Sequence, residues 1–161
     1  MPAPLGARPD RVTPVLLQAP TACLPLSRPR GRETETKEET TPMQLFTKPI
    51  IEKLAENGRA NAEAMADDGD THDFFPVVKL FTPDGAATWL LSEIDPDEPD
   101  IAFGLCDLGV GCPELGSVRI SELESARGPL GMPIERDLHF KAKHRLTTYA
   151  DQAREAGRIV A

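Results

Sequence analysis

The charged residues with the strongest potential for chemistry lie together in the C-terminal part of the chain. Glu135, Arg136 and His139 fall within five positions of one another, in the segment PIERDLHF. A carboxylate, a guanidinium and an imidazole could perform acid–base catalysis if the fold brought them into one pocket. On a strand, Glu135 and His139 would share a wet face, and Arg136 would lie on the apolar one. A small enzyme that uses these three residues is therefore kept as an alternative function.

Arg136 also has a structural interpretation, which we favour over the catalytic one. An arginine on an apolar face usually pairs with a carboxylate, because an unpaired charge is costly to remove from water. Glu93, Glu122 and Glu124 are the carboxylates that could supply this partner. The sequence therefore predicts a structural ion pair for Arg136.

Contact with a partner is a further use for these side chains. Trp89 is the only tryptophan, and it is expected first in the core and second as an anchor for a partner. Arg127 opens the glycine-rich segment 127–131, although the C-terminal end of a helix disfavours a bound anion. The candidate partner-binding residues are Trp89, Arg127, Glu135, Arg136 and His139.

No metal site, cofactor or catalytic residue is assigned from the sequence. The acidic segment 67–73 is the best candidate for a cation site, because it contains four aspartates and a histidine. A calcium loop needs ligands at alternate positions and a glycine at the sixth, and Gly69 comes too early for that order. We therefore interpret the segment as a solvated acidic loop.

The cysteines are expected to be free thiols. Cys23, Cys106 and Cys112 are odd in number and lack the paired spacing of a metal site, which is typical of a cytosolic protein. Asp107 and Glu114 make the surroundings of the last two acidic, which should raise a thiol pKa. Neither cysteine is therefore expected to act as a nucleophile.

Composition divides the chain near residue 42. Residues 1–42 hold eight of the 16 prolines, so we expect a disordered tail or a mis-assigned start there and a single domain over residues 43–161. The tail holds six of the 18 basic and five of the 26 acidic residues, which leaves 12 and 21 in the domain, a net charge of −9. Direct binding to nucleic acid is not expected of so acidic a domain, and no segment is long enough to span a membrane.

Apolar spacing and turn residues predict the elements of this domain. A first helix should begin after Thr47 and end at Asn57-Gly58, with the alanine-rich segment 59–66 as a second helical piece. The turn 82–85, with proline and glycine at its centre, should join two strands as a hairpin. The predicted strands are 77–81, 87–94, 101–106, 115–120 and 134–140.

Alternation along the strands predicts which side chains share a face. In the strand 87–94, Trp89 and Leu91 should lie on one face and Leu90 and Ile94 on the other. The strand 101–106 should present large apolar side chains on one face and small ones on the opposite face.

Two further helices are predicted from their ends. Ser121, with a glutamate three residues later, forms the pattern of a capping box, and Gly128 should close that short helix. Thr147 or Thr148 could cap a final helix that Gly157 ends. The order of elements predicts an α+β domain with an antiparallel meander sheet of about four or five strands, N- and C-terminal helices and one short helix, the helices packed on one face.

A family resemblance rests on three segments, VVKLFTPDGAATWLLSEID (77–95), DIAFGLCDLG (100–109) and ELGSVRISELESARGPLGMPIERDLHF (114–140). Through these, and above all through SELESARGPLGMPIERDLHF, the chain resembles a family of small bacterial proteins classed only as a domain of unknown function. Members are often encoded on plasmids and other mobile elements. The resemblance implies a bacterial, cytoplasmic protein, and it carries over no catalytic residue.

The leading hypothesis is a small cytoplasmic binding or accessory protein linked to mobile-element biology, whose acidic surface meets a protein partner. One form of it is DNA mimicry, which requires the carboxylates of segments 67–73, 93–100 and 107–114 on one face. The sequence identifies neither the partner nor the oligomeric state.

Overall fold

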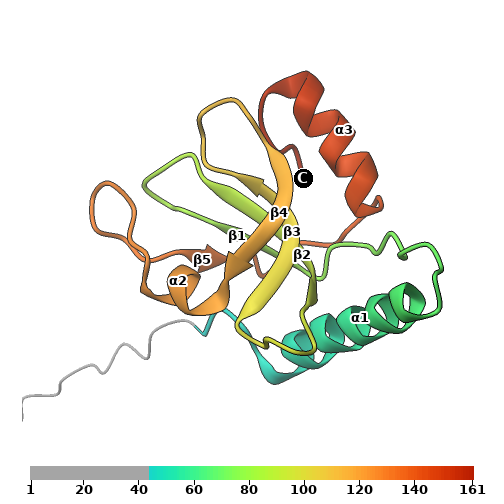
Figure 1. Cartoon of the computed structure of the whole chain (residues 1–161). Coiled ribbons are helices and arrows are strands. Elements are labelled where there is room, and N and C mark those ends of the chain that lie inside the picture. The colour runs from blue at the N-terminus through green and yellow to red at the C-terminus, as the bar shows by residue number, and fades with distance from the viewer. Residues whose placement is uncertain (1–43) are drawn as a thin grey trace, which may run out of the picture. The chain divides into compact units, whose positions relative to one another are not determined.

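The computed structural model describes residues 44–161, and the predicted tail at residues 1–42 lies outside them. In this part of the chain, five antiparallel strands form one sheet in the order β4-β3-β2-β1-β5, accompanied by three helices (Figure 1). The predicted α+β class is confirmed. The elements in chain order are α1 (Lys48–Ala66), β1 (Val78–Phe81), β2 (Thr88–Ile94), β3 (Ile101–Asp107), β4 (Glu114–Arg119), α2 (Ile120–Ser125), β5 (Glu135–Arg136) and α3 (Leu146–Ala156).

The strands β1 to β4 form the predicted meander, because each connects to its neighbour through a short loop. In the first turn the backbone N–H of Gly85 donates to the carbonyl of Thr82 at 3.3 Å. β5 then joins the free edge of β1, where Leu80 pairs with Arg136. The two edges of the sheet are therefore β4 and the short β5.

β5 is much shorter than the predicted strand 134–140. The backbone N–H of Asp137 still donates to the carbonyl of Lys79, but the Asp137 carboxylate accepts the backbone N–H of His139 at 3.0 Å. An aspartate that bonds two residues ahead favours a turn over a strand. The chain leaves the sheet there, so Leu138 is 62% exposed instead of lying on a buried face.

A bulge in β2 changes which side chains share a face. The pairing of β2 with β3 shifts between Leu91 and Glu93, with Ser92 as the extra residue. Ile94 therefore packs in the same core as Trp89 and Leu91, and the prediction that it lies on the opposite face with Leu90 is wrong. The shift also leaves Glu93 paired with Phe103.

Helices cover both faces of the sheet, so the expectation that they pack on one face is wrong. On one face, Leu54 of α1 and Leu123 of α2 pack against a core that includes Trp89 and Leu91. On the other face, α3 packs on Leu90 and Leu105. The predicted division of β3 into a large and a small face is confirmed, because Phe103 and Leu105 meet α3 whereas Ala102 and Cys106 meet the first core.

The first helix does not end at Asn57-Gly58 but continues to Ala66. Asn57 and Gly58 are buried because they contact β2. The Asn57 side-chain amide donates to the carbonyl of Ser92 at 2.7 Å, and a Cβ added to Gly58 would lie 1.7 Å from the carbonyl oxygen of Ile94. The pair that resembles a helix stop is therefore where α1 touches the sheet most closely.

Distant aspartates supply the helix caps that the sequence assigned to local residues. α2 begins at Ile120, and the Asp100 carboxylate accepts both the backbone N–H and the hydroxyl of Ser121, so Ser121 is not the cap. These hydrogen bonds lower the pKa of Asp100. In α3 the Asp73 carboxylate accepts the N–H and hydroxyl of Thr147.

The ends of these helices differ in how well they were predicted. α2 ends at Ser125, three residues before Gly128. A Cβ on Gly128 would lie 1.6 Å from the Asp84 carboxylate, which accepts the backbone N–H groups of Leu130 and Met132. Gly128 therefore permits a close contact between loops rather than closing a helix. Gly157 ends α3 as predicted, with φ at 67°.

Candidate functional site

The structure does not gather Glu135, Arg136 and His139 into one site. Arg136 donates to the backbone carbonyl of Leu45 at 3.4 Å and lines a cavity of about 240 Å³ to which neither Glu135 nor His139 contributes. His139 is exposed, and its backbone N–H is held by Asp137. Within residues 44–161 Arg136 forms no ion pair, so the predicted carboxylate partner is wrong.

The other two candidates for partner contact have structural contacts of their own. Arg127 donates to the carbonyls of Glu124, Ser125 and Ala126, which are the unpaired acceptors at the C-terminal end of α2. Trp89 is only 6% exposed and packs in the first core. Trp89 is therefore largely covered, whereas Arg127 is exposed although its guanidinium is engaged at the end of α2.

The acidic segment 67–73 does not gather into a cation site. Among the described residues there is no group of three or more histidine, cysteine, aspartate or glutamate side chains placed to hold a metal. Asp73 turns toward α3, whereas Asp67, Asp68 and Asp70 remain exposed. No helix of this part of the chain has the length and apolarity to cross a membrane.

The thiols differ sharply in exposure, which gives a first testable prediction. Burial raises the pKa of the Cys106 thiol to about 11, so the predicted rise is present, although its cause is burial rather than acidic neighbours. At pH 8 on the order of one Cys106 in a thousand is then a thiolate, the reactive form. We expect iodoacetamide at that pH to alkylate the exposed Cys112 long before Cys106, as read by peptide mass spectrometry. Equal alkylation rates of Cys106 and Cys112 would contradict the burial of the Cys106 thiol.

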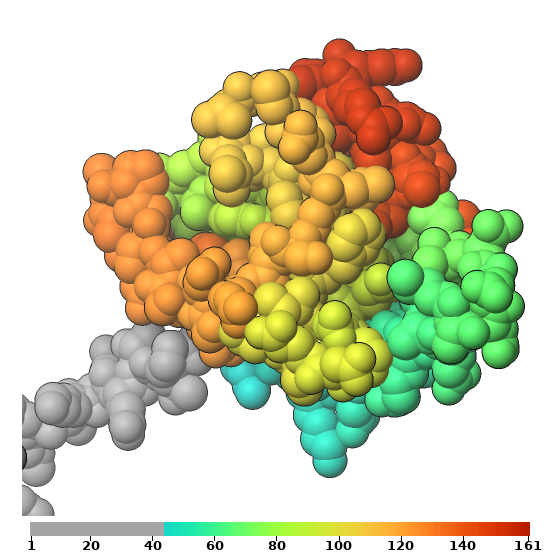
Figure 2. All heavy atoms as spheres, in the orientation of Figure 1, coloured from blue at the N-terminus to red at the C-terminus, as the bar shows by residue number. Residues whose placement is uncertain are grey.

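A groove of about 540 Å³ lies where the C-terminal half of α1 faces the sheet. It forms because β4 presents only Ser117 opposite Phe103, and a small side chain leaves the sheet surface uncovered there. Figure 2 shows this face, with the green end of α1 at the right, the yellow β2–β3 segment beside it and the orange β4. The α1 groove, as we call it, is lined by Gly58, Asn61, Ala62, Met65, Ala66, Glu93, Ile94, Asp95, Pro96, Asp97, Ile101, Phe103 and Ser117.

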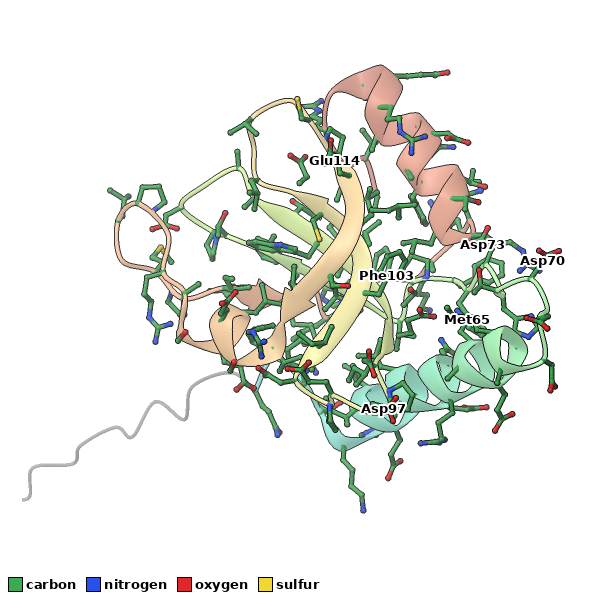
Figure 3. The ribbon with its side chains drawn as sticks, viewed as in Figure 1. Met65, Asp70, Asp73, Asp97, Phe103 and Glu114 are labelled. Atoms are coloured by element: carbon green, nitrogen blue, oxygen red, sulfur yellow. The ribbon has the colours of Figure 1, made fainter. Side chains whose placement is uncertain are left out.

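The α1 groove combines exposed apolar surface with negative charge. Met65 is 64% exposed although it is large and apolar. Figure 3 shows Met65 and Phe103 at the centre of this face, with Asp97 toward one end and Asp70 toward the other. The lining contains three carboxylates, those of Glu93, Asp95 and Asp97, and no lysine or arginine.

Asn61 fixes the position of Glu93 within the groove. Its side-chain amide donates to the Glu93 carboxylate and to the carbonyl of His72, and its oxygen accepts the His72 backbone N–H. Burial raises the pKa of Glu93, and the hydrogen bond from Asn61 offsets part of that shift. The groove thus holds a partly desolvated carboxylate in one place, where an incoming cation would favour its ionised form.

A larger cavity of about 690 Å³ lies at the other end of the sheet, and three of its four charged side chains, those of Lys79, Asp107 and Asp137, already have partners. Lys79 pairs with Asp137 at 3.4 Å and donates to the carbonyl of Ala161. Asp107 is 2% exposed and accepts the backbone N–H groups of Gly109 and Ile159. These contacts give three of that cavity's charges a structural role. The α1 groove is the better candidate site because its lining adds the exposed apolar side chain of Met65 to carboxylates of one sign.

Sequence reasoning missed the groove residues, although part of the signal was present. Phe103 was predicted on a large apolar face, but nothing marked it as uncovered. Met65 lies beyond the expected end of the first helix, and Glu93 faces the groove only because of the bulge at Ser92. A small side chain at Ser117 produces no periodicity or motif, so the sequence alone does not mark it as part of a groove.

Comparison with known proteins adds one relationship. No curated protein and no solved structure matches the chain. A family model described as "Protein of unknown function (DUF2958)" matches residues 45–160, which is nearly all of the part that the structure describes. The chain therefore belongs to this family of proteins of unknown function.

Proposed function

We propose that this protein is a non-catalytic binding or accessory protein, and that the α1 groove receives a basic segment of a protein partner. The observation that carries the proposal is the groove's lining, which has three carboxylates, no basic side chain and an apolar centre at Met65 and Phe103. Apolar anchors with charges at the rim are how protein interfaces generally combine affinity with specificity.

The charge of the groove argues for a polypeptide rather than a nucleic acid. A phosphate backbone would meet Glu93, Asp95 and Asp97 with like charge, whereas lysine and arginine side chains would be attracted. DNA mimicry receives less support. It requires the acids of three segments on one surface, whereas Asp107 is buried, and Asp100 and Asp73 bond to α2 and α3, which pack on opposite faces of the sheet.

The biological setting remains part of the proposal. The family resemblance suggests a bacterial cytoplasm and an accessory role in mobile-element biology, and an acidic groove is compatible with a partner that is itself basic, as many DNA-handling proteins are. The enzyme alternative gains no comparable observation, because Glu135 and His139 do not line the cavity beside Arg136.

A peptide-display selection on the full 161-residue chain tests this function. We expect a random library of extended peptides to be enriched for sequences with lysine or arginine on both sides of a large apolar residue. Exchanging Asp97 for lysine should weaken the enriched peptides at least about tenfold, since it reverses one charge at the rim. Ser117→Trp, which fills the groove, should abolish their binding.

The control is Glu155→Lys, which makes the same charge reversal at an exposed position of α3 outside the groove lining. This variant should bind the enriched peptides as the native chain does. The proposal fails if no basic peptide is enriched, or if Asp97→Lys and Glu155→Lys weaken binding equally.

A further inference from the structure

At Ser117 the α1 groove borders β4, an edge strand of the sheet. β4 is the terminal strand of the sheet, and no strand pairs with it on the outside within residues 44–161. Its four central residues, 115–118, are uncharged, and no proline or lysine interrupts them. Natural edge strands usually carry charged side chains or proline, which prevent pairing with other chains. In Figure 1, β4 is drawn in front of β2 and β3.

The register identifies which backbone groups of β4 face outward. The N–H of Ile120 donates to the carbonyl of Asp100, so this pair is hydrogen-bonded, and bonded pairs alternate along an antiparallel ladder. The bonded pairs within the strands are then Ala102 with Val118, Gly104 with Gly116 and Cys106 with Glu114.

A contact on the other side of β3 supports this assignment independently. The carbonyl of Ile101 accepts the N–H of Asp95, so the backbone of Ile101 points toward β2 and that of the next residue points toward β4. The N–H and carbonyl groups of Leu115 and Ser117 and the N–H of Arg119 are therefore directed away from the sheet, whereas the carbonyl of Arg119, as the N-cap, accepts the first hydrogen bond of α2.

Ser117 connects the edge with the groove. Ser117 lines the groove and pairs with Phe103, so a strand added to β4 would place alternate side chains on the groove face beside Ser117. Acids lie near both ends of β4. Glu114 is its exposed first residue, and at its other end Arg119 is paired with Glu98, next to Asp97 in the β2–β3 loop.

We infer that the partner segment binds as an extended strand that pairs with β4 and becomes the sixth strand of the sheet. This inference rests on the proposed function and specifies its mode. The segment's backbone bonds the outward groups of Leu115, Ser117 and Arg119. An apolar side chain opposite Ser117 enters the α1 groove, and flanking lysines or arginines meet Asp97 and Glu114. Recognition of this kind takes its affinity from the main chain and its specificity from alternate side chains.

Amide exchange in the full chain tests the mode, with the tightest peptide from the display selection as the probe. In the free chain, the amides of Leu115, Ser117 and Arg119 should exchange rapidly and those of Gly116 and Val118 slowly. Saturating peptide should slow the first three at least about tenfold, because each amide gains a hydrogen bond, and should change the other two little.

A scan of the peptide itself provides the second measurement and needs no variant of the protein. N-methylation removes one backbone donor at a time, so a strand bound along one edge should lose affinity at every second position. If the peptide binds in the groove but the exchange of Leu115, Ser117 and Arg119 is unchanged, or the scan shows no alternation, strand addition is overturned and the proposed function stands. Concentration-dependent protection of these amides without peptide would assign the edge to a second copy and overturn the inference.

Discussion

Replacing Gly58 by alanine is expected to destabilise the fold by about 3 kcal/mol or more. Helix propensity alone gives the opposite sign, since alanine is favoured over glycine inside a helix by about 1 kcal/mol. Packing decides the outcome, because the new Cβ would lie 1.7 Å from the carbonyl oxygen of Ile94 and 2.8 Å from its carbon. Those are backbone atoms of β2, so relief requires α1 to move away from the sheet.

Urea unfolding followed by the fluorescence of Trp89 measures this effect, since that single tryptophan lies in the core that α1 covers. Gly116→Ala is the matched control. It makes the same chemical change where the added Cβ meets nothing within 4 Å, and it should leave the stability within about 0.5 kcal/mol of the native value. A Gly58→Ala variant as stable as this control would show that α1 does not approach β2 so closely.

The same contact shows why the sequence predicted the strands better than the first helix. Alternation in β3 and in β2 as far as Leu91, and the proline–glycine turn between β1 and β2, are local signals that tertiary contacts only reinforce. Asn57-Gly58 is also a local signal, but burial overrides it. The amide of Asn57 and the missing side chain of Gly58 are used against Ser92 and Ile94, 35 or more positions away.

The predictions of the helix caps were wrong for a related reason. Local rules look for an acceptor at the first residue of the helix, whereas here Asp100 and Asp73 accept from Ser121 and Thr147 across 21 and 74 positions. Asp84 and Asp107 likewise accept backbone N–H groups of distant segments, which makes four such aspartates. Part of the acidic character that suggested a binding surface is therefore used to hold segments of the fold together.

The candidate site could not be predicted from the sequence because it depends on the absence of a large side chain next to Phe103. Phe103 is a normal strand residue, and it becomes part of a groove only because Ser117 on the neighbouring strand is small and α1 extends as far as Met65. The charge of the groove depends on the bulge at Ser92, which brings Glu93 opposite Phe103. Each of these features involves two or more segments, so a scan for clustered catalytic residues passes over them.

Removal of the Asp107 carboxylate is expected to have the second large effect. Its two oxygens accept the N–H of Gly109 at 2.8 Å and that of Ile159 at 3.0 Å, and the residue is 2% exposed. Asp107→Ala leaves both donors without a partner, for an expected loss of about 3 kcal/mol in the free energy of unfolding. Urea unfolding measures that loss.

A local measurement separates this mechanism from general destabilisation. Asp107 holds the segment after α3 to the sheet through Ile159, so in the alanine variant trypsin should cut after Arg158 faster than after Arg154, which lies within α3. Asp107→Asn is the matched control. Its single carbonyl oxygen can accept only one of the two N–H groups and its amide opposes the other, so its stability should fall between the native and alanine values. An asparagine variant as stable as the native chain would mean that one of the two hydrogen bonds contributes nothing to stability. Asp107 would then no longer explain how the β3–β4 loop and the C-terminal segment are held together.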